Sequence, residues 1–365
     1  MPVLFHPDQL RHRPRFEGSR GRRIDHLERV TRAGRILAAL AASERFEVTP
    51  PKRRLGAREL EETHAPALVR YLRGACVRLG AEAFYPNVFP KRFSVAAPER
   101  GLVRAGFYCL DAGTPLTRHA YDAARLAAAC AVEGAERLLS GAAREVYALS
   151  RPPGHHAERD LFGGYCYFNN AALAARRLRT AGRVAVVDID FHHGNGTQAL
   201  FWEDPRILVI SIHGDPEHFY PYFSGFAGET GGGAAKGTNL NLPMPAGVDD
   251  AAYRALVERK VLPAVRAFAP ASLVISAGFD TYAGDPIGAF ALTGPFFGEL
   301  GERFGRLGLP TLIVQEGGYQ VSALGRNVRR FLEGFLDGRA PANTFTGRAA
   351  GSPPRRTATR PRRRR

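Results

Sequence analysis

Cysteine is scarce in this sequence, and long apolar runs are absent from it. The four cysteines are Cys76, Cys109, Cys130 and Cys166, and no two are spaced as CxxC, which disfavours a zinc ribbon or a redox pair. So few cysteines in a chain of 365 residues are typical of a reducing compartment. No stretch approaches the roughly 20 apolar residues of a membrane span, and the N-terminus lacks the apolar segment of a signal peptide. We therefore expect a cytoplasmic protein that makes no membrane contact.

Acidic residues are outnumbered by basic ones, 35 to 51, which gives a formal net charge of +16. Residues 355–365 contain seven arginines and no acid, and removing these seven charges leaves +9 on the rest. A charged segment without large apolar residues cannot bury a core and is predicted to be disordered. We expect one folded domain over residues 1–338 and a basic tail over 339–365. The tail is either a solvated segment or a non-specific contact for polyanions.

Four short apolar runs predict the central strands of a parallel sheet. They lie at residues 146–149, 184–187, 273–275 and 312–314, with helix-length segments between them. This alternation indicates βαβ units. Ligands bind outside the carboxyl ends of such strands, so the polar groups that follow the four runs should converge on one site.

Helices are predicted where apolar residues recur at helical spacing. The clearest stretches are residues 24–42, 57–73 and 121–139. The segment 84–93 mixes aromatic residues with prolines, is not periodic, and is predicted to be a functional loop or an interface.

Carboxylates and a histidine follow the second and third runs. Alternate residues of an extended chain face the same side, which aims Asp190 and His192 at one point with Asp188 beneath them. Asp280 follows the third run and supplies a third donor. Two carboxylates and one imidazole suit zinc, and three protein ligands leave a position open for water, as in catalytic zinc sites. A capping aspartate beside surface histidines is the alternative interpretation of the isolated motif.

A histidine pair and a tyrosine follow the first and fourth runs. His155 and His156 come after a Pro-Pro-Gly turn. Amide hydrolysis needs a base for water and an acid for the leaving amine, and histidine titrates in the range for both. Asp188 and Asn195 are the natural partners to fix the imidazole tautomers. Tyr319 follows two glycines and is placed to donate to an oxyanion; a core tyrosine after a turn is the alternative.

These residues resemble the histone deacetylase superfamily, and within it they are most similar to the bacterial acetylpolyamine amidohydrolases. The motifs are RPPGHHA (151–157), GGYCYFNNAA (163–172), DIDFHHGNGTQ (188–198), SIHGDP (211–216), SAGFDT (276–281) and QEGGY (315–319). The resemblance spans about residues 5–336. It implies an arginase-like α/β fold with three layers and a central parallel sheet of about eight strands.

The resemblance also implies roles for the candidate residues. Asp190, His192 and Asp280 would bind one zinc ion per chain. His156 would act as general base and acid, with His155 as its electrostatic partner. The remaining roles are Asp188 as the partner of His155, Asn195 as the partner of His156, and Tyr319 as the oxyanion donor.

A substrate tunnel and a second ion follow from the same resemblance. Tyr165 and Tyr220 would flank the tunnel for the acyl chain, with Gly164 and Ile287 also along it. A narrow aromatic slot suits an extended aliphatic amine. A structural potassium ion would be held by the backbone carbonyls of Asp188, Asp190 and His192 together with Ser211.

Some positions depart from specialised relatives. Ile287 stands where a eukaryotic polyamine deacetylase has an acidic gatekeeper, and Gly113 falls near a tunnel-mouth glutamate of a polyamine-selective bacterial relative. Glu99 and Asp111 are nearby in sequence and are candidate substitutes. The segment 84–93 resembles a bacterial insertion that narrows the entrance and builds a dimer, so a homodimer is expected.

The leading hypothesis is zinc-dependent removal of acetyl groups from small acetylated amines such as acetylpolyamines. Deacetylation of acetyl-lysine in proteins is the nearest alternative, and the basic body of the chain favours it over a polycationic substrate. A catalytically silent binding module is disfavoured by the intact set of candidate residues. An arginase-like dinuclear hydrolase would need more bridging carboxylates.

Overall fold

The computed structural model describes residues 1–19, 21–88 and 101–339, and these build an eight-stranded sheet between two helical layers. The strands run in the order β4-β1-β5-β10-β9-β6-β7-β8, and each pairing is parallel. Their bounds are β1 Pro2–Leu4, β4 Glu47–Thr49, β5 Glu145–Ala148, β6 Val184–Asp188, β7 Ile207–Gly214, β8 Asn239–Met244, β9 Ser272–Ala277 and β10 Thr311–Gln315. The predicted fold class is confirmed.

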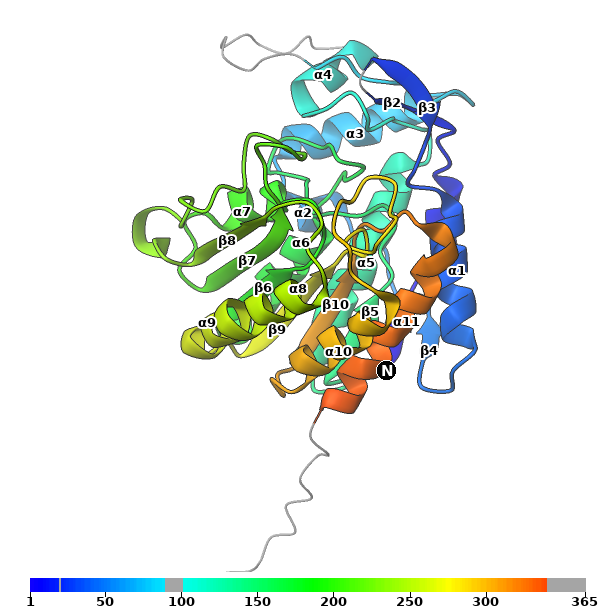
Figure 1. Cartoon of the computed structure of the whole chain (residues 1–365). Coiled ribbons are helices and arrows are strands. Elements are labelled where there is room, and N and C mark those ends of the chain that lie inside the picture. The colour runs from blue at the N-terminus through cyan, green and yellow to red at the C-terminus, as the bar shows by residue number, and fades with distance from the viewer. Residues whose placement is uncertain (20, 89–100, 340–365) are drawn as a thin grey trace, which may run out of the picture.

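Helices cover both faces of the sheet (Figure 1). One face carries α1 (Val30–Ala41), α8 (Asp250–Leu256), α9 (Leu262–Phe268), α10 (Gly294–Gly305) and α11 (Val321–Gly338); the other carries α5 (Ala120–Leu139), α6 (Asn170–Leu178) and α7 (Asn195–Phe201). In β6, Val184 and Val186 pack toward α5 and α6, whereas Ala185 and Val187 pack on the opposite face. Alternate side chains of a strand point to opposite faces, and both faces are covered here. The strand therefore reads as an unbroken apolar run.

Smaller elements gather at one end of the sheet (Figure 1). They are the hairpin β2 (Phe16–Ser19) and β3 (Arg22–Asp25), and the helices α2 (Ala57–Glu61), α3 (Pro66–Arg78) and α4 (Ala105–Tyr108). Short 3-10 turns lie at Pro7–Arg11, Leu102–Arg104, Arg179–Ala181 and Gly233–Ala235, and a π-helical turn at Val257–Val261 joins α8 to α9.

Two of the predicted helices differ from the structure. The prediction over residues 24–42 begins too early, because Arg22–Asp25 pair with Phe16–Ser19 and α1 starts at Val30. The prediction over residues 57–73 spans a break, because α2 ends at Glu61 and α3 starts at Pro66. Proline lacks the N–H that would continue a helix and tends to begin one instead.

Three predictions fall wholly or partly outside the described residues. They concern the basic tail at 339–365, the acidic substitute Glu99, and the segment 84–93 beyond residue 88. They stay predictions. The last described helix, α11, ends at Gly338. Among the described helices, none has the length and apolar character that crossing a membrane requires.

Candidate active site

The carboxyl ends of four neighbouring strands carry the predicted chemical groups. The strands β5, β10, β9 and β6 are adjacent at the centre of the sheet. The segments 149–156, 316–319, 278–280 and 189–193 follow them directly. Because parallel strands end on the same edge of a sheet, the four segments meet there. The four apolar runs found in the sequence therefore bring their motifs to one place.

Asp190, His192 and Asp280 form one buried cluster. Their possible ligand atoms all lie within 4.8 Å of one another. His192 Nδ1 is 3.0 Å from Asp280 Oδ2 and 3.3 Å from Asp190 Oδ1. Burial, together with the negative charge of Asp190, raises the pKa of Asp280 to about 7. Two buried carboxylates this close are stabilised by a shared cation, and the donor set of two oxygens and one nitrogen fits zinc.

Glycines let the backbone pass close to this cluster. A Cβ on Gly278 would lie 2.0 Å from Asp190 Oδ2, and one on Gly317 would lie 2.5 Å from Asp280 Oδ2. Gly317 N also donates to Asp190 Oδ2 at 2.8 Å. Both turns therefore require glycine because the space that a side chain would take holds the carboxylates.

His155 and His156 lie side by side with different partners. Their ring centroids are 3.9 Å apart. His155 Nδ1 is 2.9 Å from Asp188 Oδ2, and His156 Nδ1 is 2.7 Å from Asn195 Oδ1. Burial lowers the pKa of His155, but the charges of Asp190 and Asp188 outweigh it and raise that pKa to about 10. Burial and the neighbouring positive charge of His155 hold the pKa of His156 well below its usual range.

The orientation of Asn195 fixes the tautomer of His156. Asn195 Nδ2 donates to Glu158 Oε1 at 2.9 Å and to the carbonyl of His156 at 3.3 Å. Its Oδ1 therefore faces the ring, and an amide oxygen only accepts, so His156 Nδ1 carries the proton. The lone pair of Nε2 is left to accept a proton. Glu158 was not identified from the sequence, although it lies only two residues after the histidine pair.

Tyr319 is held by a buried arginine from α1. Arg32 Nε donates to the carbonyl of Gly318 at 2.7 Å and Nη2 to that of Glu316 at 2.6 Å. The guanidinium carbon lies 4.8 Å from the centre of the Tyr319 ring. Burial raises the pKa of Tyr319 well above its usual range, so the phenol keeps its proton and can donate. Arg32 was missed; the available signal was a charged residue beside Ala33 and Ile36 on the buried face of the helix.

Glu316 links the segments after β10 and β5. Its Oε2 accepts from Gly154 N at 2.7 Å and from His155 N at 3.2 Å. Burial raises its pKa to about 8. In the sequence, Glu316 is identified only as a member of the QEGGY motif. In the structure it fixes the backbone beneath the histidine pair.

The predicted tunnel residues Tyr165, Tyr220 and Gly164 lie close to His156 and Tyr319. The Tyr220 ring is perpendicular to the His156 ring, and their centroids are 4.9 Å apart. The ring centroids of Tyr165 and Tyr319 are 5.7 Å apart. Gly164 passes so close that a Cβ would lie 2.2 Å from His156 Cδ2. The structure thus brings these three predicted residues together.

Two acidic residues accept hydrogen bonds from the phenol groups of the predicted tunnel tyrosines. Tyr165 Oη donates to Glu17 Oε1 at 2.8 Å, and Tyr220 Oη donates to Asp111 Oδ2 at 3.0 Å. Asp111 was considered from the sequence as an acid near the mouth. Glu17 was missed, because it comes from the distant hairpin strand β2 and follows no strand of the main sheet.

The remaining predicted residues lie at the edges of this arrangement. Ile287 lies in the segment after Asp280 and connects to the site through Asp285, which accepts its N–H at 3.1 Å. Ser211 of β7 is in register with Asp188 of β6, which places it beside the carbonyls predicted to hold potassium. Its hydroxyl is 2.8 Å from His213 Nδ1.

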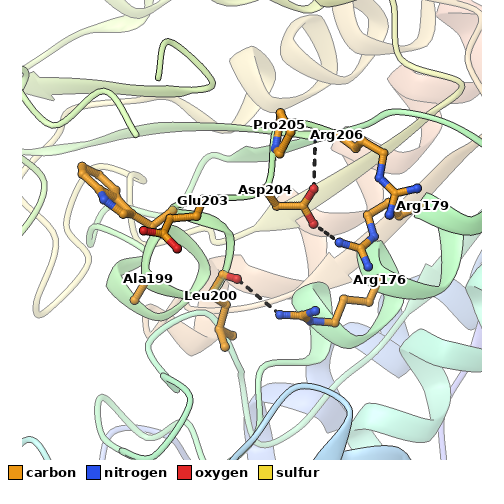
Figure 2. Close-up of a pocket in the computed structure, with 9 residues that line it drawn as sticks. Arg176, Arg179, Ala199, Leu200, Glu203, Asp204, Pro205 and Arg206 are labelled. Carbon is orange, nitrogen blue, oxygen red and sulfur yellow. Dashed lines mark hydrogen bonds and ion pairs between the residues drawn. The ribbon is translucent and has the colours of Figure 1, made fainter. Parts of the chain in front are cut away.

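A pocket elsewhere has a different character (Figure 2). Its volume is about 570 Å³, and it lies between the ends of α6 and α7 and the segment before β7, at the amino end of that strand. Arg179 there pairs with Asp204, and Arg176 donates to the carbonyl of Leu200 at 3.3 Å. The predicted site residues do not line it. We therefore place the chemistry at the carboxyl ends of the strands.

Comparison with known proteins agrees with the geometry. The family model of the histone deacetylase domain matches residues 26–335. The acetylpolyamine amidohydrolase of Burkholderia pseudomallei is 42% identical over 344 residues, 92% of this chain and 98% of that protein. Acetylpolyamine amidohydrolase 2 of Pseudomonas aeruginosa is 39% identical over 342 residues, with the same two coverages. A crystal structure of the acetylpolyamine aminohydrolase from Burkholderia pseudomallei, from an iodide soak, has a TM-score of 0.88 at 41% identity and covers 93% of this chain and 100% of that one. The resemblance predicted from the motifs is confirmed.

Proposed function

The chain belongs to the histone deacetylase family, and from this premise we propose that it removes acetyl groups from acetylpolyamines by metal-assisted hydrolysis. The observation that carries the proposal is the meeting of three groups at one sheet edge. These are the cluster of Asp190, His192 and Asp280, the neutral imidazole of His156, and the protonated phenol of Tyr319. Metal-assisted amide hydrolysis uses a metal site, a proton acceptor and an oxyanion donor, and these three groups supply one of each.

The metal cluster supports one zinc ion per chain. Zinc bound by these three residues would lower the pKa of water to about 7 and polarise the acetyl carbonyl. The neighbouring groups handle protons and charge. His156 Nε2 accepts the proton of the attacking water and returns it to the leaving amine. The Tyr319 hydroxyl donates to the oxygen of the acetyl group as negative charge develops on it.

His155 influences the pKa of His156 and does not itself transfer the proton of the attacking water. The charge of Asp190 and the contact with Asp188 raise the pKa of His155 and so favour its protonated form. The resulting positive charge beside His156 disfavours a second proton there. A general base must be free to accept at neutral pH, and this pairing supports that condition.

The acids at the tunnel support a cationic amine as the substrate. Glu17 and Asp111 each accept a hydrogen bond from one of the two proposed tunnel tyrosines, and this supports a role for both carboxylates beside the chain beyond the acetamide. The ammonium groups of a polyamine are stabilised by nearby negative charge. The names of the two amidohydrolase relatives favour the same substrate class.

Further proposals concern ions, assembly and compartment. The backbone carbonyls of Asp188, Asp190 and His192, with Ser211, would hold a structural potassium ion. We propose residues 1–338 as the catalytic domain, a homodimer as the assembly and the cytoplasm as the compartment. The four cysteines, all buried and unpaired, support a reducing compartment. The tail at 339–365 is either a solvated segment or a non-specific contact for polyanions.

One assay tests the substrate. The purified protein, loaded with zinc, is given acetylputrescine, acetylspermidine and an acetyl-lysine peptide, and kcat/KM is measured for each. The acetylpolyamines should give the highest values, and chelation should abolish turnover. A higher kcat/KM for the peptide would establish the protein deacetylase alternative instead. Binding of acetylated ligands without turnover would establish the silent module.

A further inference from the structure

We propose that Asp285 is a positioning residue that sets the place of the Tyr319 phenol. The proposal rests on the proposed function, because it assumes that Tyr319 donates to the acetyl oxygen. Asp285 lies five residues after Asp280 in the segment that follows β9. Tyr319 follows the neighbouring strand β10. One carboxylate therefore connects the two segments.

Asp285 accepts four backbone hydrogen bonds. Its Oδ2 accepts from Tyr319 N at 2.7 Å and from Gln320 N at 2.9 Å. Its Oδ1 accepts from Ile287 N at 3.1 Å and from Gly288 N at 3.3 Å. The residue is 7% exposed. A buried carboxylate is costly unless its oxygens are hydrogen-bonded, so this arrangement is specific for a group with two accepting oxygens.

Two of these bonds are made at the start of α11, where the backbone N–H groups have no acceptor within the helix. Tyr319 precedes the first turn of α11, and Gly318 before it adopts φ 111°, a conformation that favours glycine. The N–H groups of Tyr319 and Gln320 lie at this helix start, where helices leave donors without intrahelical partners. Asp285 satisfies both. Losing it would free the backbone that aims the phenol, and a misplacement of 1 Å can cost about 100-fold in rate.

The Asp285 carboxylate also binds the backbone of the two residues Ile287 and Gly288 in its own segment. Its bonds to Ile287 N and Gly288 N close a turn, and a Cβ on Gly288 would lie 1.7 Å from the Asp280 carbonyl oxygen. Asp285 thereby joins the backbone at Tyr319 to the turn that carries Ile287 and passes close to the backbone of Asp280. The sequence gives no sign of this link, because the partners are 34 residues apart.

Asparagine is the sharpest replacement. It keeps the shape of aspartate but has one accepting oxygen, so its NH₂ group must face one pair of backbone N–H donors. Asp285→Asn should lower kcat by about 10- to 100-fold, with KM changed by less than about 3-fold and zinc content unchanged. The exposed Asp249 caps α8 through Ala252 N and provides the control, since Asp249→Asn should leave kcat unchanged.

A double-mutant cycle separates positioning from general support of the fold. If Asp285 acts through the phenol, Asp285→Asn should cost less than about 3-fold in a Tyr319→Phe background, because the group it positions is already gone. An undiminished cost in that background would overturn the proposal, and so would an unchanged kcat for the single variant. Wild-type turnover by Tyr319→Phe would instead overturn the proposed role of the tyrosine.

Two further measurements test the proposal if the protein shows no activity or if Asp285→Asn does not fold. Amide hydrogen exchange should be faster in the peptide containing Tyr319 and Gln320 of Asp285→Asn than in the wild type, whatever the substrate; equal protection would overturn the proposal. If that variant does not fold, Gln320→Pro removes one of the same bonds from the other side. Its φ of −74° suits proline, and Gln320→Ala is the matched control that keeps the N–H. Equal kcat for these two variants would also overturn the proposal.

Discussion

Replacing Glu28 by glutamine should destabilise this protein more than replacing Arg32 by methionine. Glu28 Oε1 lies 2.9 Å from Arg32 Nη1 and 2.9 Å from Arg151 Nε. All three side chains are at most 2% exposed. The triad holds two positive charges and one negative charge in the interior. The single carboxylate is therefore the group on which both guanidiniums depend.

The magnitudes follow from what each variant leaves unpaired. Glu28→Gln leaves two buried guanidiniums without a counter-charge, and breaking a buried pair in this way costs about 3–5 kcal/mol. Arg32→Met leaves Glu28 and Arg151 as a neutral pair. The carbonyl of Glu316 keeps a second donor, Gln315 Nε2, at 3.0 Å. The carbonyl of Gly318 loses its bond to Arg32, and one such loss costs about 1–3 kcal/mol.

Urea unfolding followed by circular dichroism measures the difference. The free energy of unfolding should fall further for Glu28→Gln than for Arg32→Met, by about 2 kcal/mol from the magnitudes above. Glu333→Gln is the control, because Glu333 pairs with Arg329 on the partly exposed surface of α11. Such pairs contribute about 0–1 kcal/mol. A larger loss of unfolding free energy for Arg32→Met than for Glu28→Gln would refute the reasoning. It would mean that the number of hydrogen bonds lost decides stability and the balance of buried charges does not.

Five further variants test the site and the tail. Asp190→Ala should lose zinc and turnover together while the fold persists, and stoichiometric zinc by elemental analysis would contradict the ligand assignment. His156→Ala should keep zinc and lose about 10²- to 10⁴-fold in kcat, and Tyr319→Phe about 10²- to 10³-fold; wild-type rates would exclude these roles. Glu17→Gln should lower kcat/KM more for acetylspermidine than for a neutral N-acetylated alkylamine, and equal losses would argue against recognition of charge. Deleting residues 352–365 should leave kcat/KM for acetylputrescine unchanged, whereas a large fall would place the tail at the site or an interface.

The central strands of the sheet were predictable because each one is a continuous apolar run in the sequence. Each of the four apolar runs is buried on both faces, so hydrophobicity alone marks it. The helix predicted over residues 24–42 failed at its start for the opposite reason. Residues 22–25 are held as a strand by pairing with residues 16–19, and Ile24 is 37% exposed, so its apolar character reflects no helix face. A pairing between segments does not appear in the periodicity of either one.

The same distinction separates the site residues that were found from those that were missed. Asp190 and His156 lie in the segments that follow β6 and β5, so a local pattern places them. Arg32 reaches the carbonyl of Gly318 across 286 residues of sequence, and Tyr165 meets Glu17 across 148. Their positions are set by how α1 and the β2–β3 hairpin pack against the sheet. Reasoning from strand exits therefore finds the reacting groups but not the residues that hold them.

The local arrangement of acids also changes how the net charge bears on the substrate. A formal charge of +16 argues against a polycation only if that charge acts at the tunnel. Seven of the positive charges lie in residues 355–365, and exposed charges farther than about 8 Å are largely screened at physiological ionic strength. Glu17 is 4% exposed and bonded to a tunnel tyrosine, so its charge is screened far less. Under the proposed function, Glu17 and Asp111 are the carboxylates that an entering amine would meet, so their local charge bears on the substrate more than the net charge does. A basic protein is therefore compatible with a cationic substrate.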